Sequence, residues 1–390
     1  MNQKLLLAGL AVVTVASNVY AIPAFARQMN VSCSACHRDN GYPTLNRFGR
    51  DFKASGYTMI GAESTIDDNK PRGKFLSLPD TLNVSIIAEP SITKASDSDT
   101  NVNTSTIGMF LGGRIGEHMG TFVEVGYSED SQSWGLGNLI LPITYKVGNY
   151  TYGFVPFNTD GNGVTASFEL LSTADGAITA INAREHAAQG LGAYVYNKNF
   201  YVNYTAWANG NKSASDIKLA SSLRAVYTPF IAGWDLAFGV QYMTGDVNAV
   251  DDNDKAIPAT SLSTDAYAVD FQALGKLANL PVDFAASYGS ATSETSGLGS
   301  AFTGLNSNDS TAFVVDLSVG IIPRELVVLA NYAHTDNGTD TAGEDAKNNA
   351  EMFGLRYFLM QNVSAQTDIT FNSSNQESDQ AWGLSMLIAF

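Results

Sequence analysis

Histidine, cysteine and positive charge are scarce in this sequence of 390 residues. It contains four histidines, two cysteines, and 22 lysine and arginine residues against 38 aspartate and glutamate residues, for a formal net charge of −16. An acidic chain whose basic residues are not interleaved with aromatic stacking positions gives no support to nucleic-acid binding. No Ser-His-Asp grouping is evident, so we assign no catalytic side chain.

Long apolar runs are also missing after the first 21 residues, which excludes a transmembrane helix there. At the start of the chain, Lys4 precedes an apolar run from Leu5 to Ala16, and Val19-Tyr20-Ala21 supplies the residue types that a signal peptidase recognises. The run is too short to span a bilayer, so we interpret residues 1–21 as a secretory signal rather than a membrane anchor. We therefore expect an exported protein.

Large apolar residues alternate with small or polar ones in many segments. Such a strand has one apolar and one polar face. In a membrane barrel the apolar face meets lipid and the polar face meets the lumen, whereas in a soluble sandwich the apolar face meets a second sheet. The secretory signal, the abundant Tyr and Phe, and the terminal Phe390, which resembles the signal read by the barrel assembly machinery, favour the barrel. The pattern is clearest in 265–273, 282–288, 313–321 and 381–390.

The sequence therefore predicts an all-β protein, a transmembrane antiparallel β-barrel over residues 76–390, in the bacterial outer membrane. A barrel of about sixteen strands has a lumen wide enough for a channel or a plug. The predicted strands lie near 81–93, 104–116, 119–129, 138–147, 150–157, 188–196, 199–209, 219–228, 233–245, 264–274, 281–291, 310–320, 325–335, 350–359, 362–373 and 380–390.

Two kinds of connection join these strands. Short ones, such as 196–200, are expected at the periplasm, and long acidic ones on the outside. The acidic side chains could attract cations to the outer mouth, or serve only for solvation and divalent bridging to the outer leaflet. The segment 158–187 could fold into the lumen or form a surface loop. The acidic residues are Asp97, Asp99, Asp246, Asp251, Asp252, Asp254, Asp336, Asp340, Glu344 and Asp345.

The two cysteines are Cys33 and Cys36, and His37 follows them directly. Cys-x-x-Cys-His is the attachment signature of a c-type haem, with two thioether bonds and the histidine as proximal ligand. A zinc site would need further cysteine or histidine nearby, and a disulfide does not require the histidine. The sequence therefore predicts one covalently attached haem c on Cys33 and Cys36, with His37 as the axial ligand of the haem iron.

The haem motif lies in a predicted cytochrome module, residues 22–75. Leu45, Phe48 and Phe52 share a face at helical spacing, and Gly56 stands where a helix would end. The module has eight basic and five acidic residues, so its charge of +3 would favour docking into the acidic barrel. About fifty residues bury little surface alone, and we therefore expect the partly helical module to plug the lumen. Basic side chains that could meet the haem propionates, or lie on a solvated helix face, are Arg47, Arg50 and Lys53.

The segment 22–59 resembles the N-terminus of the fused monohaem cytochrome–porins of the outer membrane of iron-oxidising bacteria. The remaining four-fifths of the chain agrees with that family in architecture only. The resemblance covers Pro23, Phe25, Ala26, Arg27, Cys33, Cys36, His37, Pro43, Leu45, Phe48, Gly49, Phe52, Gly56 and Tyr57.

This resemblance implies an electron-transfer oxidoreductase that oxidises extracellular Fe(II) and passes single electrons through one haem to a soluble periplasmic c-type cytochrome. Outer-membrane lipid would surround the barrel. Three alternatives stay open: electron exchange with a different extracellular donor or acceptor, a porin gated by its haem plug, and a cytochrome that serves only as a structural plug.

The sixth haem ligand is the least determined part of the predicted site. Met59 follows the predicted helix and could fold back over the open face of the haem, and a methionine ligand raises the reduction potential relative to histidine. We therefore name Met59 as the candidate, with packing as the alternative role. The other candidates are Met29, His118, His186 and His334, or an open site.

Overall fold

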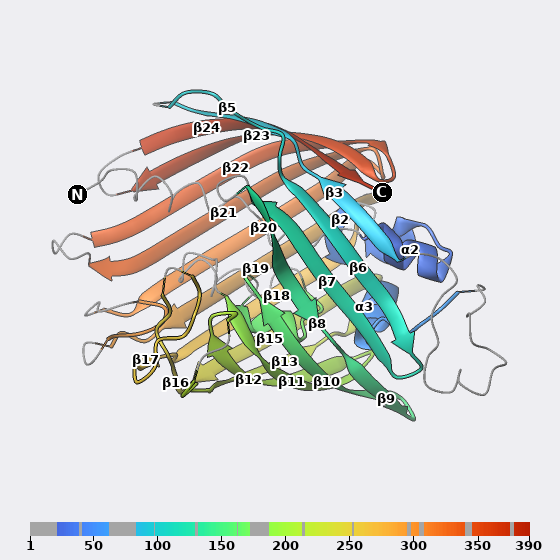
Figure 1. Cartoon of the computed structure of the whole chain (residues 1–390). Helices are drawn as coiled ribbons and strands as arrows, with labels where there is room; N and C mark the ends of the chain where they lie inside the picture. The colour runs from blue at the N-terminus through green and yellow to red at the C-terminus, as the bar shows by residue number, and fades with distance from the viewer. Residues whose placement is uncertain are drawn as a thin grey trace.

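The structure, a computed structural model, describes most of the chain from Ile22 to Phe390 (Figure 1). The predicted secretory signal and the predicted boundary between module and barrel, residues 75 and 76, lie outside the described residues. The described ranges are 22–38, 41–61, 83–96, 98–128, 132–161, 163–171, 187–212, 215–251, 253–294, 298–303, 308–339, 345–374 and 378–390.

Antiparallel pairing closes twenty described strand segments into one barrel. Four pairs of consecutive segments, β3/β4, β5/β6, β8/β9 and β13/β14, each follow the same neighbouring strand, so each pair is one interrupted strand. The described residues thus form a closed barrel of sixteen strands, which confirms the predicted class and strand number.

The barrel segments follow the predicted runs closely along the whole chain. Their bounds are β3 (Val84–Ala88), β4 (Ser91–Ala95), β5 (Asn101–Asn103), β6 (Ile107–Gly116), β7 (Met119–Ser128), β8 (Ser133–Ile140), β9 (Ile143–Val147), β10 (Tyr150–Thr159), β11 (Ala188–Asn197), β12 (Phe200–Asn209), β13 (Ala220–Tyr227), β14 (Phe230–Ile231), β15 (Trp234–Thr244), β18 (Ala266–Leu277), β19 (Leu280–Ala291), β20 (Ser310–Ile322), β21 (Leu326–Thr339), β22 (Asp345–Met360), β23 (Val363–Ser374) and β24 (Ser378–Ala389).

Proline explains three of the four strand interruptions. Pro90, Pro142 and Pro229 lie in the breaks of β3/β4, β8/β9 and β13/β14. Proline has no N–H to donate to a neighbouring strand, so regular pairing stops there. The pairing resumes after each break, and the barrel stays closed.

The two ends of the barrel differ in the length of their connections. At one end the strands are joined by tight turns, such as Lys198–Asn199 and Ala278–Asn279, and the predicted short connection at 196–200 is confirmed. At the other end the connections are longer, and the one between β15 and β18 carries the small strands β16 (Asp246–Val247) and β17 (Leu262–Ser263). Short turns face the periplasm in bacterial barrels.

Side-chain exposure follows the predicted alternation. On β18, Tyr267 and Val269 are exposed on the outer face, whereas Ala268 and Asp270 are buried on the inner face. β24 closes the barrel against β3 and β4, and the backbone of Phe390 exchanges hydrogen bonds with that of Ile86. The outer face is therefore the apolar one, as a lipid-facing wall requires.

The predicted module forms α2 (Pro23–Met29), the 3₁₀ turn η1 (Cys33–Ala35), the two-stranded ribbon β1 (His37–Arg38) and β2 (Gly41–Leu45), and α3 (Arg47–Ala54). Figure 1 shows the two blue helices at the short-turn end of the barrel. Leu45 ends β2 rather than lying on the helix face predicted for it, because α3 begins only after its cap residue Asn46. Gly56 follows the helix with φ of 68°, as a terminating glycine should.

None of the described helices is long and apolar enough to cross a membrane.

Candidate functional site

Cys33, Cys36 and His37 lie on one tight turn. The N–H of Cys36 donates to the carbonyl of Cys33 at 3.1 Å, which closes the 3₁₀ turn η1, and His37 begins the next strand. Both cysteines are free and partly exposed. The disulfide alternative is therefore not what the structure contains, and both sulfurs are open to covalent attachment.

Asn46 holds this turn against α3. Its Nδ2 donates to the carbonyl oxygens of Ala35 at 2.9 Å and His37 at 3.3 Å, and its backbone N–H donates to the carbonyl of Cys36 at 2.9 Å. The same side chain caps the helix, because its Oδ1 accepts from the N–H of Gly49 at 3.0 Å. One residue thus fixes the attachment turn and the start of α3 together.

Gly49 allows the close approach of α3 to the attachment turn. A Cβ atom at this position would collide with the carbonyl oxygen of Cys36. The helix and the turn therefore pack backbone against backbone, which the sequence signalled only as a glycine inside a helical pattern.

The surroundings of Cys36 disfavour the thiolate form of its side chain. Burial, with a further contribution from neighbouring Cys33, raises the pKa of the Cys36 thiol to about 11. Thiolate is the form that binds zinc or acts as a nucleophile, and this environment disfavours it. Within the described residues, no three His, Cys, Asp or Glu side chains are grouped to hold a metal ion.

An aromatic and methionine cluster covers one side of the module. Phe25 stacks on Tyr57 with ring centroids 4.7 Å apart and meets Phe52 edge-on at 5.3 Å. Met29 is buried in this cluster, and Met59 packs against it half-buried. The two methionine candidates for the sixth haem ligand therefore share one apolar surface.

The histidine candidates lie elsewhere. His118 is exposed at the turn between β6 and β7, where its ring stacks on Tyr145 at 4.4 Å. His334 lies on β21, in the part nearer the long loops, and its Nδ1 is 2.7 Å from Oδ1 of Asn349 on β22. His186 lies outside the described residues. The packing of His118 and His334 agrees with structural roles on the barrel, and Met59 stays a prediction.

Two arginines of the module are paired with acids on the inner face of the wall. Arg50 Nη2 lies 2.8 and 2.6 Å from the two carboxylate oxygens of Asp235, and both side chains are buried. Arg38 Nε lies 3.2 Å from Asp283, and its Nη2 donates to the carbonyl of Gly275 at 3.0 Å. These contacts join the module to β15, β18 and β19.

The other basic residues of α3 also interact with the barrel. Arg47 donates to the carbonyl oxygens of Lys198 at 2.7 Å and Thr228 at 3.3 Å, and its guanidinium lies over the ring of Phe230. Burial lowers the pKa of the Lys53 ammonium, and nearby Glu169 offsets part of this effect.

Gln28 ties the opposite side of the module to the wall. Its Nε2 donates to the carbonyls of Tyr57 and Met59 at 2.7 and 2.6 Å, and its Oε1 accepts from Asn83 Nδ2 at 3.1 Å and from the N–H of Arg114 at 2.9 Å. This fully buried side chain therefore links α2 to the backbone of Tyr57 and Met59, to the residue that precedes β3, and to strand β6.

Between these anchors, the wall strands β9 and β11 bind the end of α3. Tyr194 Oη donates to the carbonyl of Ala54 at 2.7 Å, and Thr144 Oγ1 donates to the carbonyl of Ser55 at 2.9 Å. The segment 22–61 is thus bound to the wall from β3 round to β19 at the short-turn end.

The beginning of the long segment 158–187 folds against the inner wall. Gly163–Ser167 forms the 3₁₀ turn η2, and the Phe168 ring that follows stacks on Tyr194 with centroids 3.6 Å apart. Phe168, Leu170 and Leu171 share a buried cluster with Ala54 of α3. Of the two alternatives for this segment, the described residues 163–171 follow the lumenal one, and residues 172–186 lie outside the described part.

Glu169 anchors this lumenal segment. It accepts from Arg224 Nε at 3.0 Å, from Tyr201 Oη, and from the N–H groups of Leu170 and Leu171 at 2.8 Å each. Arg224 also pairs with Asp270, with its Nη2 3.0 Å from Oδ1. This charged network was not predicted from the sequence. The feature that could have indicated it is a charged residue, such as Arg224 or Asp270, at an inward position of a predicted strand.

Two acidic residues of the long loops have local partners. Asp251 accepts from the N–H groups of Asn253 at 2.9 Å and Lys255 at 3.1 Å, and these bonds lower the pKa of its carboxyl group. Asp336 lies 3.6 Å from Lys347. These contacts favour a structural role for these two acids. The side chains of Asp97, Asp252, Asp340, Glu344 and Asp345 lie outside the description.

No family model and no curated protein matches the sequence. Solved structures with the same fold are outer-membrane proteins. An anion-selective porin from Comamonas acidovorans aligns over 79% of this chain and 98% of its own, with a TM-score of 0.52 and 12% identity. A loop-deletion mutant of OmpT from Vibrio cholerae aligns over the same shares, with a TM-score of 0.50 and 12% identity. The chain is therefore a porin-like barrel of the bacterial outer membrane.

Proposed function

We propose that this protein is an outer-membrane c-type cytochrome–porin that oxidises extracellular Fe(II) and delivers single electrons to a soluble periplasmic cytochrome. The observation that carries the proposal is the Cys33–His37 turn, clamped by Asn46 in a module bound to the inner wall of the barrel. A haem on this turn would lie at the short-turn end of the barrel, the end that faces the periplasm in bacterial barrels.

The residues present fit such a group. Cys33 and Cys36 would hold it by thioether bonds, His37 would ligate its iron, and Met59 is the proposed sixth ligand. When bound, the haem supplies one-electron redox chemistry. The chain itself would keep the attachment turn rigid through Asn46 and exclude water with the cluster of Phe25, Phe52 and Tyr57.

The wall contacts give the module a fixed position. A single redox group can serve both sides of a membrane only if donor and acceptor each approach it closely. Arg50–Asp235, Arg38–Asp283 and the Gln28 contacts hold the module at the short-turn end of the barrel. This position supports approach of a periplasmic acceptor at the short turns, and the outside donor would have to reach the haem through the lumen.

Fe(II) as the donor rests on charge. The chain carries 38 acidic residues against 22 basic ones, and many acids lie in the long loops. A negative potential at the outer mouth raises the local concentration of cations. The collective field supports Fe(II) over an anionic donor, even though single acids such as Asp251 and Asp336 have local structural partners.

The attachment of haem is tested with the full-length chain exported in a bacterium that matures c-type cytochromes. The outer-membrane fraction should carry a band that stains for covalent haem and shifts with the barrel on heating. The double variant Cys33→Ala/Cys36→Ala should yield the barrel without the stain, and Ser34→Ala should retain it. A stain-negative wild-type barrel would overturn the cytochrome part and leave the porin-like barrel.

A redox-gated porin is the second candidate, favoured by the lumenal segment 163–171 and the module packing together through Phe168 and Ala54. Planar-bilayer conductance should then differ between the oxidised and the reduced protein. Conductance that is equal in the two states would exclude gating. Electron exchange with a non-iron partner is tested by replacing Fe(II) with each alternative external donor in the same haem absorbance measurement.

A further inference from the structure

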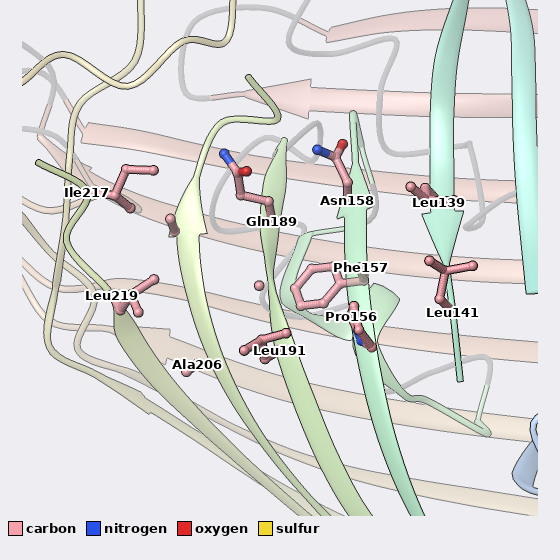
Figure 2. A pocket seen from close by; sticks show the side chains of 12 residues that line it. Leu139, Leu141, Pro156, Phe157, Asn158, Gln189, Leu191, Ala206, Ile217 and Leu219 are labelled. Atoms are coloured by element: carbon pink, nitrogen blue, oxygen red, sulfur yellow. The ribbon is translucent and has the colours of Figure 1, made fainter. Parts of the chain in front are cut away.

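An apolar groove runs along the outer face of the barrel at the long-loop end of β8, β10, β11 and β12. Its volume is about 360 Å³, and Figure 2 shows its lining side chains. This volume lies at the small end of the range for ligand clefts, about 300–1,000 Å³. Its apolar walls are Leu139, Leu141, Pro156, Leu191, Ile217 and Leu219.

Small residues make the groove. Ala206 and Ala208 line it at outward positions of β12, where other outward positions on this wall carry large side chains, such as Tyr204 and Leu223. The small side chains on β12 therefore leave a hollow in the outer face, and leucine side chains line its edges.

The described residues 215–219 before β13 form one side of the groove. Ile217 and Leu219 line the groove, and the N–H of Lys218 between them donates to Asn248 Oδ1 at 2.8 Å. On the other side, Gln189 Nε2 donates to the carbonyl of Gly210 at 3.1 Å, and Asn158 Nδ2 donates to that of Asn211 at 2.8 Å. These hydrogen bonds fix the polar side chains at the rim of the groove, so the shape of the groove is determined by the fold of this wall.

We propose that this groove binds one acyl chain of an outer-leaflet lipid. The occupant follows from the position of the groove: it is continuous with the apolar outer face, which hydrocarbon surrounds in the membrane, and it opens at the long-loop end, where the outer leaflet lies. Its apolar walls match a hydrocarbon chain, while the amides of Asn158 and Gln189 supply the polar side chains of its lining.

The probe is a phospholipid with a photoreactive diazirine on its acyl chain, incorporated into vesicles that contain the full-length protein. After illumination, peptide mapping measures labelling at each outward-facing position. The expected result is labelling of the groove peptides, around Leu191 and Ala206 to Leu219, several-fold above lipid-facing positions outside the groove, such as Val269.

Two matched variants separate a bound chain from general lipid contact. Ala206→Phe fills the groove and should reduce groove labelling to the level of Val269. Ala193→Phe adds the same ring to the outer face of β11 outside the lining and should leave the labelling unchanged. Heat-modifiable migration shows that both barrels fold.

Uniform labelling of the outer face, or groove labelling that survives Ala206→Phe, would overturn the proposal. Cross-links between two copies of the chain through groove residues would also overturn it, since they would assign this face to a protein interface. The result is independent of haem attachment, so it does not depend on the function proposed above.

Discussion

Arg50 of α3 and Asp235 of β15 form a buried ion pair, although 185 residues separate them in the sequence. Nη2 of Arg50 lies 2.8 Å from Oδ1 and 2.6 Å from Oδ2 of Asp235. Burial of two charges is costly unless each meets its partner. The pair therefore makes the position of α3 dependent on the barrel wall, and it connects the segment that carries Cys33, Cys36 and His37 with the porin-like fold.

Removal of one partner tests this dependence. Arg50→Met leaves Asp235 buried and unpaired, and loss of one member of a buried pair costs about 3–5 kcal/mol. We expect the module to detach, so that limited proteolysis within residues 47–61 cuts the variant but spares the wild type.

Two further variants check that result. Arg50→Met with Asp235→Leu should recover much of the protection, because no unpaired charge remains. Arg38→Gln, at a pair that is more exposed, should cause a smaller loss. Full protection in Arg50→Met would show that the pair does not hold the module.

Substitution can separate the two roles of Asn46, which caps α3 and donates hydrogen bonds to the turn that carries Cys36. Asn46→Ala loses the helix cap, worth about 0.5–2 kcal/mol, and the two bonds to the attachment turn. Asn46→Asp keeps the acceptor for Gly49 but cannot donate to Ala35 and His37. We expect both variants to lower the denaturant midpoint of the haem absorbance, with the alanine variant lowest. If aspartate behaves like the wild type, the clamp on the turn is not what stabilises it.

Met59 as the sixth haem ligand has a spectroscopic test. Met59→Ala should abolish the methionine–iron charge-transfer band of the oxidised protein and lower the reduction potential, because methionine ligation raises it. Met29→Ala, in the same apolar cluster, should keep the band. The reverse outcome would assign the ligand to Met29, and loss in neither variant would exclude both.

Lys53 should impart a pH dependence on the stability of the module. Its pKa is lower in the folded protein than the ordinary value of 10.5. The unfolded chain therefore binds the proton more readily between the two pKa values, and stability rises as the pH rises through that window towards 10.5. Lys53→Met should flatten this part of the stability curve, measured by denaturant unfolding at a series of alkaline pH values. An unchanged slope would show that Lys53 titrates normally.

The sequence was sufficient for the barrel because each strand repeats a simple period. Alternation such as Tyr267 and Val269 against Ala268 and Asp270 places every strand, and the tight turns separate them. Strands were interrupted at Pro90 and Pro229, and β8, β21 and β22 extend further towards the long loops than the alternation predicted.

The site was less predictable, because its contacts join distant segments. The motif identified Cys33, Cys36 and His37, but Asn46 read only as an ordinary polar residue. The partner of Arg50 could not be found from spacing, since Asp235 follows it by 185 residues. Its signal was weaker: an acid on the inward face of a predicted strand, at the end nearest a short turn. The same signal applies to Asp283.

The most direct test of the whole account uses the oxidised protein in vesicles with its native sidedness, with Fe(II) added outside at near-neutral pH. Stopped-flow absorbance follows the haem. If the protein oxidises Fe(II), the reduced c-type bands appear rapidly. Their appearance becomes slower when the acidic long loops are neutralised by Asp→Asn substitution. No reduction by Fe(II), together with ready reduction by a small permeant reductant, would contradict iron oxidation while leaving the cytochrome and the barrel in place.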